Sequence, residues 1–494
     1  MHVSTNRASA VPAASVTPAA PAAPAAPAAP MAARTRMLLE APILPTLLRL
    51  SFPNVLNLLA IAGMITFDGL FLGRLGADAL AGVSLVFPFV MFVQHVAASG
   101  IGGAVASSIA RALGAGNHQR ANALAAHAFM LAIGATVLFS GLMLTAGPLI
   151  YRTMGGRGAA LDAALAYSNV VFSGALSVWM LNILANVVRG TGNMTLPAQV
   201  LVCSVLGHAL LSPLLIFGWG PVPALGPAGA GWGLVVTFAV GSLVLFVYLQ
   251  SARALVKLPP GWNPLTWHRA GLVRYEWALF KDILSVGIPG MANVAINNLS
   301  VILLTGIAAH LGQAAALGYA IGARLEYIII PLGFGFGTAL VAMIGTNWGA
   351  RQFARARRIA WTGTLTVAAF CGAVGVFFAL FPALWMALFN AQGEIARIGT
   401  LYLWIAAPAY AASGAGMALY YFMQGVGNLG PAVYANAARL LVSTGGALVA
   451  IHWLGAGAVG MFIAIAAGFV VYGVLGVWLM LRTPDPAAAT PKAG

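Results

Sequence analysis

Twelve long apolar segments leave this chain few ways to fold. Each is roughly 20 to 30 residues long, which is enough for an α-helix to cross the roughly 30 Å hydrocarbon core of a membrane. The segments lack the short alternating pattern of barrel strands. Only 7% of the residues are charged, against about 25% in soluble domains. We therefore expect an all-α membrane protein.

The expected spans fall into two sets of six. They cover 46–73, 82–110, 122–147, 163–189, 195–218 and 228–250, then 283–310, 315–346, 359–388, 395–424, 431–454 and 456–481. We predict an N-lobe over 37–252, a cytoplasmic linker over 253–282 and a C-lobe over 283–482. The Ala/Pro-rich residues 1–36 and the tail 483–494 are predicted to be disordered or flexible.

The two halves share landmarks at a nearly constant offset. Pro53 corresponds to Pro289 and Gly76 to Gly312. Further on, "GAGNHQRA" at 114–121 corresponds to "GARQFARA" at 349–356, and "RGTGN" at 189–193 to "QGVGN" at 424–428. Each copy has an even number of helices, so both copies start on the same side of the membrane and have the same topology. We therefore expect two pseudo-symmetric six-helix lobes around a central cavity, which is typical of a transporter.

Basic residues are distributed unevenly over the connecting segments. With the N-terminus inside, most of them fall in cytoplasmic segments, and the outer loops carry only Arg74, Arg152, Arg157 and Arg397. The positive-inside rule then predicts both termini in the cytoplasm of a bacterial inner membrane. The basic run "RQFARARR" at 351–358 is expected to meet lipid head groups rather than nucleic acid.

One of the nine acidic residues, Asp68, interrupts the first apolar span in "FDGLFLGRLGADALAGVS". A carboxylate inside the bilayer costs several kcal/mol unless it is paired, hydrated or protonated, so such residues usually face a cavity and have a function. Protonation would remove the charge of Asp68 and release a bound cation, which couples proton entry to cation exit. The alternative is a carboxylate that caps backbone near the outer end of the span.

Pro53, the stretch 67–84, "ARALGAGN" and "VVRGTGN" together resemble the multidrug and toxic compound extrusion (MATE) transporters. The resemblance covers roughly residues 46–480. It implies twelve transmembrane helices and export of small organic, often cationic, compounds, driven by a proton or sodium gradient without a cofactor. It also makes Asp68 the N-lobe coupling carboxylate and Pro53 a hinge. A static helix start is the alternative role for Pro53.

The fifth span departs from that family's pattern, in which Asn is often followed four residues later by Asp or Asn before a proline. Here His208 and Ser212 precede Pro213 and share one helical face. Sodium prefers oxygen donors and His titrates near neutrality. An Asp68–His208 pair would therefore favour proton coupling over a sodium ion at Asp68. The alternative is a histidine that only packs between helices.

In the second half, "IGARLEYIIIPLGFG" resembles the DinF-type branch of the family. Arg324 and Glu326 are two residues apart and should point in different directions. Glu326 is either a second proton site or a structural counter-charge to an arginine. Asn297 and Ser413 stand near the positions of the NorM-type sodium acids, which weakens a sodium site in the C-lobe.

The substrate cavity is the least constrained part of the prediction. The residues expected to line it are Met64, Phe67, Asn57, Gln94, Asn297 and Tyr327. Met and aromatic residues at such positions also serve simply in packing. The cysteines, Cys203 and Cys371, lie in apolar spans and indicate neither a disulfide nor a metal site.

The function that we predict is a monomeric, cation-coupled antiporter, with the proton as the expected coupling ion, that exports lipophilic cations by alternating access. A lipid-linked saccharide flippase of the same superfamily is one alternative. It would need a cationic cavity, and Arg189, Arg324 and Arg439 are the few candidates within spans. A non-transporting membrane scaffold or enzyme is the other alternative, and the internal repeat argues against it.

Overall fold

The computed structural model describes residues 33–484, without the side chains of 58–63, 65, 66, 327 and 331. The side chain of Tyr327 and most of both predicted tails therefore lie outside the described residues. The last residues of the predicted N-terminal tail, 33–36, are helical and begin α1 (Ala33–Glu40). Residues 33–484 contain helices and connecting loops, and no β-strand occurs among them.

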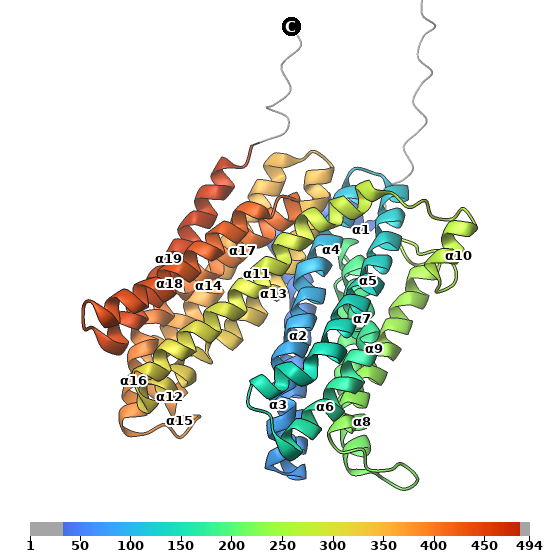
Figure 1. Ribbon diagram of the computed structural model, residues 1–494. Coiled ribbons are helices and arrows are strands. Elements are labelled where there is room, and N and C mark those ends of the chain that lie inside the picture. Colours follow the sequence, from blue (N-terminus) through green and yellow to red (C-terminus); the bar gives the residue numbers. More distant parts are fainter. Residues whose placement is uncertain (1–32, 485–494) are drawn as a thin grey trace, which may run out of the picture.

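The first half of the chain forms six spans in the predicted order (Figure 1). Its helices are α2 (Ile43–Leu75), α3 (Ala77–His95), the π-helix η1 (Val96–Gly100), α4 (Ile101–Gly114), α5 (His118–Thr153), α6 (Gly158–Ser173), α7 (Ala175–Gly190), α8 (Thr195–Phe217) and α9 (Pro227–Gln250). The segment α3–η1–α4 is a single span, and α6 and α7 form another that is bent by 48°.

The second half repeats this plan after the short helix α10 (Pro264–Arg269). Its helices are α11 (Trp277–His310), α12 (Gln313–Ala323), α13 (Glu326–Gly349), α14 (Phe353–Leu380), α15 (Pro382–Ala387), α16 (Gly393–Ala406), the 3-10 helix η2 (Ala407–Ala409), α17 (Tyr410–Val426), α18 (Gly430–His452) and α19 (Gly457–Arg482). Nine helical segments of residues 33–484 are long and apolar enough to cross a membrane, and α6–α7 is a tenth. With α2 and α16–η2–α17 they make the predicted twelve.

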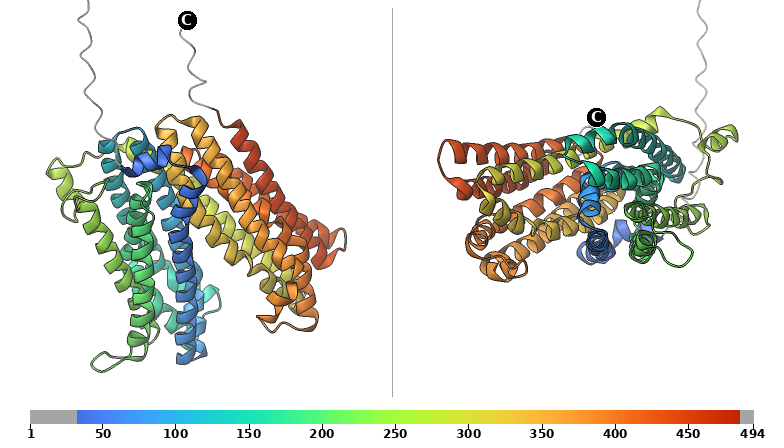
Figure 2. Two further views of the ribbon diagram at one scale, coloured as in Figure 1. Left: turned by 180° about the vertical axis from the view of Figure 1, so that it is seen from behind. Right: turned by 60° about the horizontal axis from the view of Figure 1, so that its bottom comes forward.

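The helices form two lobes, α2–α9 and α11–α19, that meet at one end of the molecule and diverge toward the other (Figures 1 and 2). Helix α1 and the last turn of α19 lie at the end where the lobes meet, which we call the junction end. There α13 packs against α2 and α4, and α11 packs against α4 and η1. The contacts between the lobes thus come mainly from a few helices.

Two glycines at repeat-equivalent positions allow the closest approach of the lobes. A Cβ atom on Gly114 would lie 2.0 Å from the carbonyl oxygen of Thr346, and one on Gly349 would lie 2.0 Å from that of Arg111. Arg111 and Thr346 are themselves related by the repeat, so the contact is reciprocal. No larger residue fits at either glycine without moving backbone, and the pseudo-two-fold relation of the lobes extends to their interface.

The segment between the lobes is packed on the N-lobe. The buried Trp267 of α10 lies 5.1 Å from Phe129 between ring centroids, and Trp262 stacks on Phe246 at 3.7 Å. The backbone N–H of Glu276 donates to His127 Nε2 at 3.1 Å. The chain therefore leaves the N-lobe only as α11 begins.

Candidate functional site

The structure brings Asp68 of α2 together with His208 and Ser212 of α8. The Nε2 atom of His208 lies 2.8 and 2.9 Å from the two carboxylate oxygens of Asp68, and the Ser212 hydroxyl donates to Oδ1 at 3.2 Å. His208 is buried, whereas the Asp68 side chain is 22% exposed. An ionised carboxylate only accepts hydrogen bonds, so His208 carries its proton on Nε2 when Asp68 is charged.

Packing fixes the orientation of the His208 ring. Its Nδ1 atom is buried and has no hydrogen-bond partner among the described residues. Gly233 of α9 packs against this edge, and a Cβ atom there would lie 3.2 Å from Nδ1. The ring is thus held between α9 on one side and the Asp68 carboxylate on the other. Tyr167 of α6, which no sequence motif marks, lies close enough to interact electrostatically with Asp68.

Pro53 lies in the interior of α2, so its alternative role as a helix start is wrong. Proline cannot donate a backbone hydrogen bond, which weakens α2 at this turn. The next residue, Asn54, donates from Nδ2 to the Thr338 hydroxyl of α13 at 2.8 Å. The turn of α2 that contains Pro53 is therefore bonded to the other lobe, and the hinge role remains a prediction.

The C-lobe acid, Glu326, accepts a hydrogen bond from the hydroxyl of Tyr402 of α16. The Tyr402 hydroxyl is also 3.2 Å from that of Tyr410 of α17, and both tyrosines are buried. Arg324 instead lies over the ring of Phe389, 5.1 Å from its centroid. The two neighbouring charges have different surroundings, as their spacing predicts. The tyrosines have no sequence signal because α16 and α17 are remote from Glu326 in the chain.

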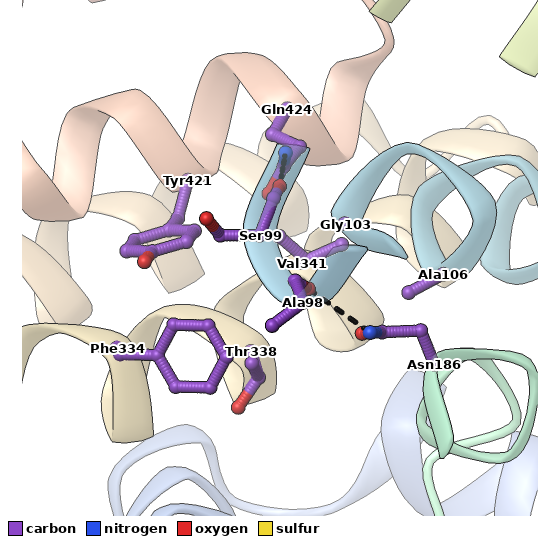
Figure 3. Close-up of a pocket in the computed structure, with 10 residues that line it drawn as sticks. All are labelled: Ala98, Ser99, Gly103, Ala106, Asn186, Phe334, Thr338, Val341, Tyr421 and Gln424. Atoms are coloured by element: carbon purple, nitrogen blue, oxygen red, sulfur yellow. Dashed lines mark hydrogen bonds between the residues drawn. The ribbon is translucent and has the colours of Figure 1, made fainter. Parts of the chain in front are cut away.

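A small pocket lies where the lobes meet (Figure 3). Its lining comes from η1, α4 and α7 of the N-lobe and from α13 and α17 of the C-lobe. The Asn186 amide donates to the carbonyl of Ala98 at 2.9 Å, and the Gln424 amide donates to that of Ser99 at 3.1 Å. A π-helix has fewer ordinary helix hydrogen bonds, and here amides from both lobes bind η1.

Of the residues expected to line the substrate cavity, none of the five with a described side chain lines this pocket. Met64 and Asn57 are buried, and Phe67 is 49% exposed. The amide nitrogen of Gln94 is buried without a hydrogen-bond partner among the described residues. Asn297 lies in the C-lobe, where its Oδ1 accepts from Arg439 Nη2 at 2.9 Å.

A cluster of charges joins the lobes at the junction end. Asp282 of α11 accepts from Arg111 of α4 at 2.8 Å and from Arg120 of α5 at 2.7 Å. Arg111 also donates to the Ser107 hydroxyl, which itself donates to the carbonyl of Gln424 of α17. One carboxylate thus links two arginines of the N-lobe to the C-lobe. In the sequence these two arginines stand out only as basic residues of the predicted cytoplasmic segments.

A sequence model of the MatE family matches residues 53–214 and 289–449. The chain belongs to the MatE family. Each matched segment lies in one lobe, which agrees with the internal repeat. The predicted MATE resemblance is confirmed, and this MatE protein is a membrane transporter rather than an enzyme. Its assignment to the DinF-type branch remains a prediction.

Curated relatives resemble this MatE chain over most of its length. An FAD transporter of Shewanella oneidensis is 25% identical over 382 residues, which is 76% of this chain and 81% of the relative. A probable multidrug resistance protein NorM of Thermotoga maritima is 27% identical over 359 residues, or 72% and 74%. A probable multidrug resistance protein YoeA of Bacillus subtilis is 25% identical over 403 residues, or 80% and 84%.

Solved structures share the fold. A MATE crystal structure in the straight conformation superposes with a TM-score of 0.82 at 24% identity and covers 92% of this chain and 98% of that one. An outward-facing MATE transporter superposes with a TM-score of 0.80 at 23% identity, with the same coverage. Both likenesses confirm the predicted layout of two helical lobes.

Proposed function

We propose that this MatE protein is a proton-driven antiporter that exports lipophilic organic cations across the bacterial inner membrane. The observation that carries the proposal is the Asp68 carboxylate, bonded to His208 and Ser212 in a membrane-spanning bundle and still partly exposed. The names of the relatives, two multidrug resistance proteins and an FAD transporter, support an organic cargo. An ion gradient would supply the energy, without a cofactor.

Proton exchange would switch the Asp68 side chain between a charged and a neutral form while cargo is bound nearby. The ionised carboxylate attracts a cation strongly because the surrounding bundle has a low dielectric constant. Protonation removes this attraction and one acceptor for the His208 proton, so cargo release and rearrangement of the pair would occur together. Coupling to sodium is less well supported, because His208 Nε2 faces both carboxylate oxygens and Ser212 is the one other oxygen bonded to them among the described side chains.

The conformational step would pass along α2. Asp68 and Pro53 are separated by roughly 22 Å along this helix, and the Pro53 turn is bonded to α13 through Asn54 and Thr338. A bend at Pro53 would therefore change both the Asp68 site and a contact between the lobes. We further propose that the junction end faces the cytoplasm with both termini, and that the protein works as a monomer among lipids whose head groups meet its basic face.

Proteoliposomes loaded with a fluorescent lipophilic cation would test the proposal under an imposed proton or sodium gradient. We expect export to follow the proton gradient and Asp68→Asn to abolish the response, because Asn cannot exchange a proton. Asp78→Asn is the matched control, since Asp78 is an exposed acid in the first turn of α3. Export driven only by sodium, or export that is unchanged by Asp68→Asn, would overturn the proposal.

A further inference from the structure

Arg439, near the middle of α18, is the centre of a polar cluster inside the C-lobe. Its Nε donates to Asn436 Oδ1 at 2.8 Å, and its Nη2 donates to Asn297 Oδ1 at 2.9 Å and to the Ser300 hydroxyl at 3.3 Å. The Asn436 amide donates in turn to Asn293 Oδ1 at 2.7 Å and to Asn297 Oδ1 at 3.1 Å. We call these five residues the Arg439 cluster.

The positive charge of the Arg439 cluster has no hydrogen-bonded counter-ion among the described residues. Every hydrogen-bond acceptor of Arg439 given above is a neutral amide or hydroxyl, and arginine keeps its charge in proteins. Glu326 is near enough to interact electrostatically, but its carboxylate accepts from Tyr402. Charges at membrane depth normally pair or face a water-filled path, so the cluster is suited to an external anion.

The geometry leaves one side of the guanidinium for such an anion. The three hydrogen bonds use Nε and Nη2 and fix the plane of the group, while Nη1 takes part in none of them. Arg439 is only half-buried, and the Tyr472 ring lies on one side with its centroid 5.9 Å away. A fixed guanidinium with free N–H groups matches the oxygens of a carboxylate or phosphate.

The internal repeat shows how this cluster relates to Asp68. Asn293 follows Pro289 by as many residues as Asn57 follows Pro53, and Arg439 follows Asn428 by as many as Ser204 follows Asn193. The pair α11 and α18 is therefore the C-lobe counterpart of α2 and α8. Asp68 lies in the first pair and Arg439 in the second, so equivalent helix pairs carry charges of opposite sign in the interior of their spans.

We propose that the Arg439 cluster is an anion-binding subsite of the transport path, which takes a carboxylate or phosphate group of the exported compound. This inference rests on the proposed function and narrows its substrate class to organic molecules that carry an anionic group beside their cationic centre. Asp68 would attract the cationic part, and Arg439 would hold the anionic part.

Binding to the purified full-length chain tests the subsite without requiring transport. The probes are a rhodamine with a free carboxylate and its methyl ester, which differ only in the anionic group, followed by fluorescence anisotropy. We expect the acid to bind about tenfold more tightly than the ester, since a charge-assisted contact is lost in the ester. Arg439→Gln should weaken acid binding by the same factor and leave ester binding unchanged. Arg324→Gln is the matched control because it removes a C-lobe arginine outside the cluster.

A second variant keeps the proposal testable if Arg439→Gln fails to fold. Asn297→Asp is nearly isosteric and places a carboxylate beside Arg439 Nη2, so it supplies an internal counter-ion and should abolish the preference for the acid. Competition by inorganic phosphate or by acetate then shows which oxyanion the subsite prefers. Equal binding of both dyes by the wild type, binding of neither, or equal weakening of both by Arg439→Gln would overturn the subsite.

The same dyes separate this inference from the proposed function. If proton-driven export of the ester depends on Asp68 and the wild type shows no preference for the acid, the antiporter proposal stands and the subsite fails. If the acid preference depends on Arg439 and neither dye is exported under a proton gradient, the subsite stands and proton-driven export fails.

Discussion

Asp68 is the residue whose charge the proposed cycle changes, and its two partners differ in what they do with a proton. The imidazole of His208 can take up a second proton as well as donate one, whereas Ser212 only orients its hydroxyl. The pairing of Asp68 with His208 was predictable because α-helical spacing puts His208 and Ser212 on one face. The contacts of Tyr402 and of Arg439 were not, because they depend on how distant helices rotate against one another.

Substitutions at His208 separate its hydrogen bond to Asp68 from its capacity to take up a proton. We expect His208→Ala to lower proton-driven export about tenfold, since a hydrogen bond to a charged group contributes about 1.5–3 kcal/mol. His208→Gln keeps a hydrogen-bond donor for Asp68 but cannot take up a proton, so it should retain export with a changed pH profile. The measurement is the pH profile of export in proteoliposomes. A wild-type profile for His208→Ala would confine this residue to packing.

Gly233 offers a way to move the His208 ring without changing its chemistry. Gly233→Ala places a methyl group 3.2 Å from Nδ1, so we expect the ring to shift and proton-driven export to fall severalfold. Overpacking of this kind costs about 1–3 kcal/mol. Gly207→Ala on α8 is the control, because a Cβ there meets Thr237 at an ordinary contact distance of 3.5 Å. Equal export by both variants would show that the ring position does not matter.

Among the elements, the helices were more predictable than their ends. The twelve spans were readable from hydropathy, but the predicted ninth span runs to 388, whereas α14 ends at Leu380. Pro382 begins the separate helix α15, because proline is favoured in a first helical turn and disfavoured inside a helix. The apolar run continues past Pro382, so hydropathy alone extends the span too far, whereas the proline marks the true boundary.

The repeated turn before α5 and α14 leads to a prediction about helix connections. Gly116 has a φ of 72°, and its repeat equivalent Arg351 has a φ of 60°. A left-handed backbone costs a non-glycine residue roughly 1–2 kcal/mol. We expect Arg351→Gly to raise the free energy of unfolding by about 1 kcal/mol, measured by thermal unfolding in detergent. Arg351→Ala is the control, because it removes the charge and keeps the strain; equal stability of both variants would contradict this explanation.

For the whole molecule, the two lobes are held together at the junction end by close glycine contacts and by the ion pairs of Asp282 with Arg111 and Arg120. The two-lobe plan followed from the repeat in the sequence. The cross-lobe pairing of Asp282 with Arg111 did not, because residues at helix ends are placed by the relative position of whole lobes. Only a three-dimensional arrangement identifies them as partners.

Asp282→Asn should loosen the junction end. Arg111 and Asp282 are only 17% and 22% exposed, so losing the charge on one leaves the other poorly compensated. We expect a cysteine introduced at the buried, pocket-lining Ala106 to react about tenfold faster with a water-soluble maleimide, in a Cys203→Ala background. Glu394→Gln, which breaks an exposed pair with Arg397, should leave the rate unchanged. No change with Asp282→Asn would show that the charge of Asp282 is not needed to hold the lobes together.

The attachment of residues 251–276 to the N-lobe has a mechanical consequence. Since Trp262, Trp267 and Glu276 anchor this segment to the N-lobe, it behaves as part of that lobe rather than as a flexible linker between the lobes. Any rotation of one lobe against the other must therefore be accommodated by the backbone between Glu276 and Asp282. Residues inserted at the exposed Gly261 would therefore lengthen the chain without increasing the motion of one lobe relative to the other. The same insertion just before α11 would increase that motion.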